Sequence, residues 1–128
     1  MLLDEEGIVK VGDYDLAVQL DHTRSERETV FGTTCYMAPE VFEGKTCLKS
    51  DVWSLGISLI EMAERKNPFD GCKIMEVIKR VLNQDPPCLC IGGWSRDFVD
   101  FVGRCLERKV NERWSVSELM EVCGCLRE

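Results

Sequence analysis

Cysteine is the residue type in this sequence with the clearest capacity for chemistry. The chain has eight cysteines among 128 residues, and four of them form two C-x-C pairs, Cys88/Cys90 and Cys123/Cys125. Four thiolates could hold zinc, but structural zinc sites usually use C-x-x-C spacing, and His22 is the only histidine available to support them. A disulfide framework is not expected without a secretory signal. We therefore predict reduced, mostly buried thiols.

A second candidate group is acidic. Residues 12–15 (GDYD) directly follow a short apolar segment, so an acidic cluster lies at the mouth of a predicted strand. On the residues alone, Asp13 is most simply an ordinary acid in a turn at a strand end. The polar segment that follows, which contains DHTRSERET, lacks helical or strand periodicity and is predicted to be a mobile loop.

One predicted helix, Ser50–Glu64, must organise the elements that position these groups. Its apolar residues cover nearly the whole circumference at 3.6 residues per turn, so we expect it in the middle of a domain. Either Ser50 or Asp51 is expected to cap its first turn. The basic pair at 65–66 is expected to complement the helix dipole, and the Asn-Pro pair at 67–68 to end the helix.

The other segments predict an α+β, mainly α fold. Residues 1–3 and 8–11 read as a β-hairpin, in which Gly7 supplies the positive φ of the turn. The GTTCYMAPE segment leaves the loop and enters a short helix, and residues 43–49 connect it to the central helix. Later helices are predicted over Lys73–Leu82, after a cap at Ser95, and after the capping-box spacing of Ser115 and Glu118. The expected architecture is one β-hairpin followed by a helical bundle around a central buried helix.

Composition and charge exclude several classes of function. Sixteen basic and 23 acidic residues give a formal net charge of -7, which argues against nucleic-acid or anionic-membrane partners. No apolar run is long enough to span a bilayer, and residues 1–3 meet three acidic residues at once, so neither a membrane segment nor a signal peptide is expected. These features indicate one domain in the cytosol or the nucleus, and we expect the cytoplasm.

The ordered motifs resemble those of a eukaryotic protein kinase. A strand, an Asp-aromatic-x triplet, a polar loop, an Ala-Pro-Glu triplet and a buried helix follow one another in the order that the family uses. The segments GTTCYMAPE, SDVWSLGISLIEMAE and WSRDFVDFVGRCLERKVNERWS are most similar to Ser/Thr kinases of the sterile-twenty-like group, the PAK and germinal-centre kinases. The resemblance covers essentially all of residues 1–128 and implies a partial kinase domain, a fragment of the large, carboxy-terminal lobe.

For the nucleotide, the resemblance implies two contacts. Asp13 matches the aspartate that holds Mg²⁺ across the ATP phosphates, where a hard cation needs oxygen ligands. Leu2 matches the apolar residue beneath the adenine ring. ATP and Mg²⁺ are thus the implied cofactors, although binding by this chain alone is doubtful.

The resemblance also implies roles in substrate binding and stability. Thr29 matches the activation-loop phosphosite, whose phosphate would order the loop by pairing with arginines. Thr33 matches the threonine of the substrate platform in Ser/Thr kinases. Glu40 and Arg113 match a buried ion pair, and Asp51 matches an acid that accepts backbone N–H bonds from the catalytic loop. Less favoured phosphosites are Thr23, Ser25 and Thr34.

Several parts of a kinase are missing from these residues. There is no G-x-G-x-x-G, no H-R-D-like loop and hence no catalytic residue, and the sequence begins one position after the place of the metal-binding Asn. Tyr14 and Asp15 replace the Phe and Gly of the D-F-G triplet, and Asp15 gives up the conformational freedom of glycine.

We expect a truncated, inactive fragment of a Ser/Thr kinase with protein substrates or signalling partners. The alternatives are a pseudokinase or protein-interaction module without catalysis, and a pseudogene-like product. Without the covering catalytic loop, apolar faces on Trp53 or Leu59 are expected to be exposed.

Overall fold

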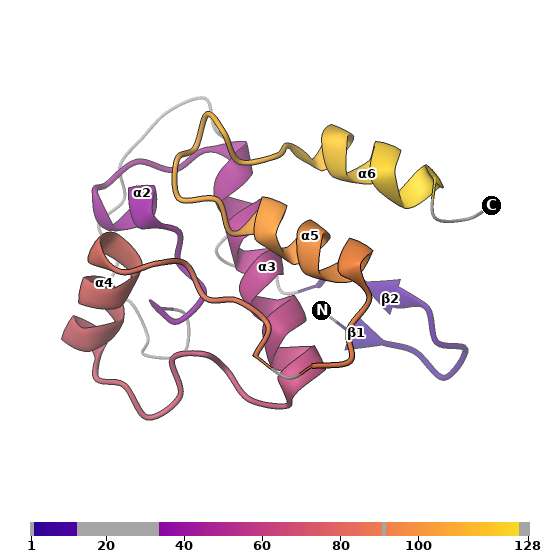
Figure 1. The fold of residues 1–128 in the computed structure, drawn as a ribbon, viewed down its shortest axis with the longest axis horizontal. Coiled ribbons are helices and arrows are strands. Elements are labelled where there is room, and N and C mark those ends of the chain that lie inside the picture. Colours follow the sequence, from indigo (N-terminus) through magenta and orange to yellow (C-terminus); the bar gives the residue numbers. More distant parts are fainter. Residues whose placement is uncertain (1, 13–33, 91, 126–128) are drawn as a thin grey trace.

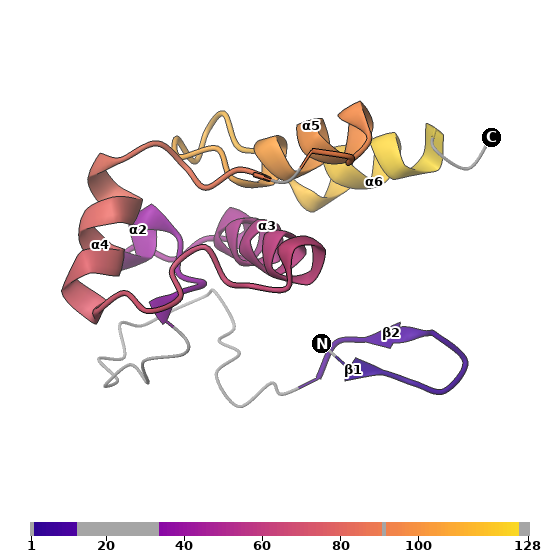
Figure 2. The same cartoon turned by 60° about the horizontal axis from the view of Figure 1, so that its bottom comes forward.

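The computed structural model describes residues 2–12, 34–90 and 92–125, and their fold is mainly helical. Figure 1 shows the elements of this part of the chain in order. They are β1 (Leu2–Leu3), β2 (Val9–Lys10), α2 (Pro39–Phe42), α3 (Leu48–Glu64), α4 (Ile74–Asn83), α5 (Arg96–Cys105) and α6 (Val116–Cys125). In Figure 2, α5 and α6 lie above α3, α2 and α4 lie to its left, and the hairpin lies below.

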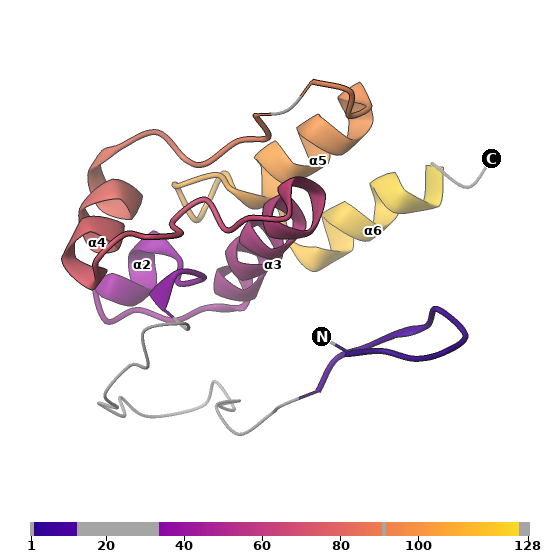
Figure 3. The ribbon, with the colours of Figure 1, turned by 90° about the horizontal axis from the view of Figure 1, so that it is seen from below.

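The predicted hairpin is confirmed. Its strands β1 and β2 are antiparallel, with Leu2 opposite Lys10. The Asp4 carboxylate accepts hydrogen bonds from the backbone N–H groups of Glu6, at 3.1 Å, and Ile8, at 2.8 Å, and Gly7 has a φ of 80° as the turn requires. The hairpin lies to one side of the helices in Figure 3, with Val9 60% exposed, so β2 adds little to the core.

The central helix begins earlier than predicted and has a different cap. α3 starts at Leu48, and Cys47 is its N-cap, which makes the expectation of a Ser50 or Asp51 cap wrong. The reason is a capping box, in which the Ser50 hydroxyl reaches back and accepts from the Cys47 N–H at 3.1 Å. At the other end, Arg65 adopts a left-handed φ of 57° as the C-cap. No basic residue lies within the last turn of α3, but Arg65 follows it directly as the C-cap, so the predicted basic pair stands at the end of the helix as expected.

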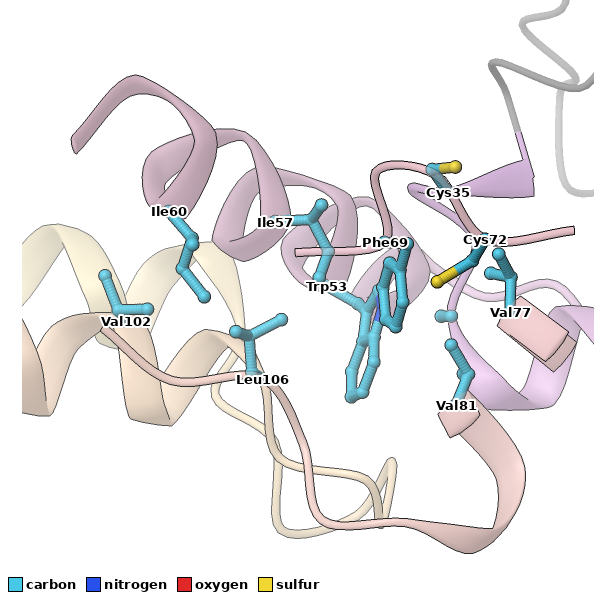
Figure 4. Packing of buried hydrophobic residues seen from close by; sticks show 11 residues of the cluster. Cys35, Trp53, Ile57, Ile60, Phe69, Cys72, Val77, Val81, Val102 and Leu106 are labelled. Atoms are coloured by element: carbon cyan, nitrogen blue, oxygen red, sulfur yellow. The ribbon is translucent and has the colours of Figure 1, made fainter. Parts of the chain in front are cut away.

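Apolar side chains from three helices meet in one core. Trp53, Ile57 and Ile60 of α3 pack with residues of α4 and α5 (Figure 4). Gly56 makes the α3–α5 approach possible, because a Cβ there would lie 2.7 Å from Leu106 Cγ and 2.9 Å from Cys105 Cβ.

The structure confirms three local predictions about the later helices. These are the helix after Lys73, the helix capped by Ser95, and the capping box of Ser115 with Glu118.

The surface of α3 is not buried on every side. Trp53 has no exposed surface, so the expectation that it would be uncovered is wrong: the Phe69 and Val81 side chains pack in the same cluster, and the Arg113 guanidinium lies 5.2 Å from its ring centre. Leu59 is half-buried, whereas Met62 is 60% exposed. None of the helices in the described ranges is long and apolar enough to cross a lipid bilayer.

The thiols divide between core and surface. Among the six cysteines whose side chains are described, Cys35, Cys72 and Cys105 are buried and Cys47 is half-buried. Cys88 and Cys90 are exposed. The prediction of mostly buried thiols therefore fails at this pair, which lies on the surface after the end of α4.

Candidate functional site

A buried ion pair joins two distant parts of the chain, as the resemblance implied. Arg113 Nη1 donates to Glu40 Oε1 at 2.7 Å, and Nη2 donates to Oε2 at 3.0 Å. Arg113 has no exposed surface and Glu40 is 7% exposed. Two parallel bonds of this kind need the planar fork of a guanidinium.

All five N–H groups of the guanidinium have acceptors. Besides Glu40, Arg113 donates to the backbone carbonyls of Glu107 at 2.7 Å, Lys49 at 2.9 Å and Arg108 at 3.4 Å. The Lys49 ammonium donates in return to the Arg113 carbonyl. Because a buried charge is costly unless its hydrogen bonds are made, this set of partners fixes the loop between α5 and α6 against the start of α3.

The carboxylate of the pair is tied to α3 as well. Ser50 Oγ donates to Glu40 Oε1 at 2.8 Å. Burial by itself would raise the pKa of Glu40, but hydrogen bonds from Arg113, from the backbone and from Ser50, together with the guanidinium charge, hold that pKa below its usual range. The carboxylate is therefore held ionised, and the Ala38-Pro39-Glu40 triplet is anchored through it.

A second network, which the sequence did not predict, holds the segment before this triplet. Tyr36 Oη donates to Glu61 Oε2 at 2.6 Å, and Asn67 Nδ2 donates to the same oxygen at 2.8 Å. Ser54 Oγ donates to the Tyr36 carbonyl at 2.8 Å. The hydrogen bond to Glu61 raises the pKa of the Tyr36 hydroxyl. The partners are 25 residues apart, and no local spacing signals them; only the position of Tyr36 beside the Met-Ala-Pro-Glu motif marked the segment.

Other predicted site residues are not brought to these networks. Asp13, Thr29 and Thr33 lie outside the described residues, as do the alternatives Thr23 and Ser25. Leu2 lies in β1, with its backbone alone described. Asp51 is exposed in the first turn of α3. Thr34 is only 3% exposed, which argues against it as a phosphosite because a modifying enzyme needs access to the hydroxyl.

The residues that the structure describes do not by themselves fit a magnesium–nucleotide complex. Mg²⁺ at phosphate needs carboxylate oxygens in octahedral geometry. Within the described ranges, no group of three or more His, Cys, Asp or Glu side chains is arranged to hold a metal ion. The one ligand that the resemblance supplies, Asp13, is outside those ranges. We derive no chemical step from ATP or Mg²⁺ at this chain.

Comparisons with known proteins agree on one family. Residues 1–122 match the family model described as Protein kinase domain. The chain is 41% identical over 124 residues to the serine/threonine-protein kinase hippo of Drosophila melanogaster, which covers 94% of this chain and 18% of that protein. It is 39% identical over 127 residues to the serine/threonine-protein kinase dst2 of Dictyostelium discoideum, which covers 94% of this chain and 11% of that protein. The chain thus spans less than a fifth of either relative.

Proposed function

This chain belongs to the protein kinase family, and we propose that it is the platform-bearing, carboxy-terminal half of a Ser/Thr kinase domain that transfers no phosphate by itself. The relatives that it resembles are Ser/Thr kinases of the sterile-twenty-like group. Protein substrates or signalling partners are the ligands that this family membership suggests for the parent protein.

The single observation that carries the platform role is the anchored Ala-Pro-Glu triplet. Glu40 is fixed from one side by Arg113 and from the other by Ser50. Tyr36, four residues earlier, is held by Glu61. A rigid α3 thus supports the backbone that follows Thr33, the proposed substrate-platform residue. Rigid support of this kind is what a binding surface needs to keep its geometry.

The proposed lack of catalysis follows from the groups that phosphoryl transfer requires. It needs a cover over the phosphates, a lysine on them with its glutamate partner, a catalytic aspartate and a second metal ligand. The 128 residues contain neither the glycine-rich motif nor the catalytic-loop motif that supply these groups. Asp13 remains the proposed metal ligand and Leu2 the proposed adenine contact, within a domain completed by other residues.

A phosphotransfer assay tests this proposal. The purified chain is incubated with radiolabelled ATP, Mg²⁺ and a generic basic protein, beside an active Ser/Thr kinase as positive control. We expect no transfer above a reaction without the chain. Transfer that is present in the chain and lost in Asp13→Asn would overturn the proposal, because it would show catalysis through that aspartate.

A second candidate function, a pseudokinase or interaction module, is favoured by the surface of α3. Leu48 is 74% exposed and Met62 60% exposed, and exposed apolar side chains of this size suit a protein partner. Thermal melts with and without Mg-ATP distinguish a chain that still binds nucleotide from one that does not. A nucleotide-dependent rise in Tm that Asp13→Asn abolishes supports retained nucleotide binding, whereas an unchanged Tm favours the bare scaffold.

For regulation, Thr29 is the proposed phosphosite of the parent kinase. Support comes from its place three residues before Gly32 in the matching motif, and from the burial of the nearest alternative, Thr34. Phosphorylation of the whole parent kinase by an upstream kinase, mapped by mass spectrometry, tests it. Loss of the activating phosphate in Thr29→Ala is the expected result, and activation that survives this change contradicts it.

A further inference from the structure

Residues 85–90, which follow α4, carry two exposed cysteines, Cys88 and Cys90. Residues 85–90 are neither helix nor strand. Leu89 packs against the main core cluster, while its neighbours Cys88 and Cys90 are exposed. Alternation of this kind is typical of an extended backbone, in which residues two apart project from the same side. The inward position of Leu89 therefore places both thiols on the outer side.

This segment is fixed rather than free. The Cys90 N–H donates to Glu64 Oε1 at 2.7 Å, which ties it to the last residue of α3. The Cys90 thiol also lies 3.5 Å from the Cys88 carbonyl oxygen. The neighbouring Cys88 thiol, slight burial and the Glu64 carboxylate raise the pKa of the Cys90 thiol. The contact of the Cys90 sulfur with the Cys88 carbonyl places that thiol beside the neighbouring cysteine, and the direction of the shift agrees with this position.

The distance expected between Cys88 and Cys90 favours metal binding over disulfide formation. In an extended segment, residues two apart have Cα atoms about 6.6 Å apart and similarly separated Cβ atoms. A disulfide needs Cβ atoms about 3.8 Å apart, so closing one here would bend the backbone away from its bond to Glu64. A metal ion between the two sulfurs fills the larger gap without that movement.

We infer that Cys88 and Cys90 form a two-thiolate site for a soft, thiophilic cation, Cu(I), on the surface beside the end of α3. Thiolates are the ligands that select Cu(I), which accepts two of them in a near-linear arrangement. Zinc is the less suitable ion, because structural zinc sites need four ligands. Within the described residues, no third His, Cys, Asp or Glu side chain joins the pair to make a larger cluster.

The binding step is balanced without a redox partner. Two S–H bonds lose their protons to solvent, two Cu–S bonds form, and copper enters and stays as Cu(I). Because two protons leave, affinity at this site should rise with pH until both thiols are ionised. The site is independent of the kinase proposal, since neither cysteine contacts the Glu40–Arg113 pair.

A Cu(I) competition titration tests this inference. The reduced 128-residue chain is titrated under nitrogen against bicinchoninate, a chromogenic Cu(I) chelator. The double variant Cys88→Ser, Cys90→Ser is compared with Cys123→Ser, Cys125→Ser, which removes the other C-x-C pair and is matched in composition. Circular dichroism checks that each variant is folded.

We expect one tight Cu(I) equivalent that the Cys88/Cys90 double variant loses, with affinity at least about a hundredfold weaker because the two linked thiolates act together. The Cys123/Cys125 variant should keep it. Unchanged Cu(I) affinity in a folded Cys88/Cys90 variant would overturn the inference. Tight Zn²⁺ binding lost equally in either double variant would also overturn it, because that result would show a four-thiolate site.

Discussion

At the scale of single residues, one guanidinium ties distant parts of the fold together. Arg113 satisfies all five of its N–H groups within the protein, and two of them go to Glu40. Lysine has a point charge and cannot make the parallel pair of bonds. Arg113→Lys should therefore lower the free energy of unfolding by about 3 kcal/mol, the usual cost of breaking a buried pair.

Urea unfolding measures this loss, and the chain contains a matched control. Arg80 pairs with Glu76 on the surface of α4 at 2.6 Å, with both side chains substantially exposed. Arg80→Lys should change stability by less than about 0.5 kcal/mol, since exposed i,i+4 pairs contribute little. Equal effects of the two substitutions would show that the buried pair is not a main source of stability.

The buried Glu40–Arg113 pair makes the stability of the fold depend on pH. The pKa of the Glu40 carboxyl in the folded protein lies below 4.5, the ordinary value of a glutamate side chain. A carboxyl whose folded pKa lies below its unfolded pKa adds stability that is present in full above the unfolded value and is lost as pH falls through the folded one. The wild-type urea midpoint should therefore decrease below about pH 4.5, and Glu40→Gln should reduce this slope. An identical pH profile in the folded variant would contradict the assignment.

At the scale of elements, the crossing of α3 and α5 rests on a glycine. Alanine at position 56 would gain about 1 kcal/mol of helix propensity, but its Cβ would lie 2.9 Å from Cys105 Cβ, which cannot swing away as a side-chain tip can. Overpacking typically costs about 1–3 kcal/mol, so Gly56→Ala should destabilise the protein on balance. Gly103, within α5, has nothing within 4 Å of a Cβ. Gly103→Ala should stabilise by up to about 1 kcal/mol, and thermal melts that failed to separate the two would contradict this account.

The sequence predicted local features of these elements better than it predicted contacts between distant residues. The caps at Ser95 and Ser115 were predictable because their acceptors and donors lie three residues apart. The cap of α3 was missed because a cysteine is an unusual N-cap, and the Tyr36–Glu61 bond because it joins residues brought together only by packing. The Glu40–Arg113 contact spans 73 positions and came from the family resemblance alone. Cys88 and Cys90 are exposed because Leu89 between them packs against the core, and the hydrophobic periodicity of the sequence does not predict that contact.

At the scale of the whole molecule, the fold carries an incompletely covered central helix. Leu55 and Leu59 of α3 are half-buried, and Met62, which follows at helical spacing, is 60% exposed. An apolar stripe in contact with water favours association of the chain with itself. Met62→Lys should therefore reduce light scattering at high concentration and sharpen the thermal transition.

The added charge needs its own control, because Met62→Lys also changes the net charge from -7 to -6. Asn83→Lys makes the same change at an exposed polar position at the end of α4. If the stripe drives association, Asn83→Lys should leave the scattering close to that of the wild type, since the repulsion between copies changes equally in both variants. A wild-type chain that melts reversibly in a sharp two-state transition as a monomer would show that α3 is already sufficiently covered.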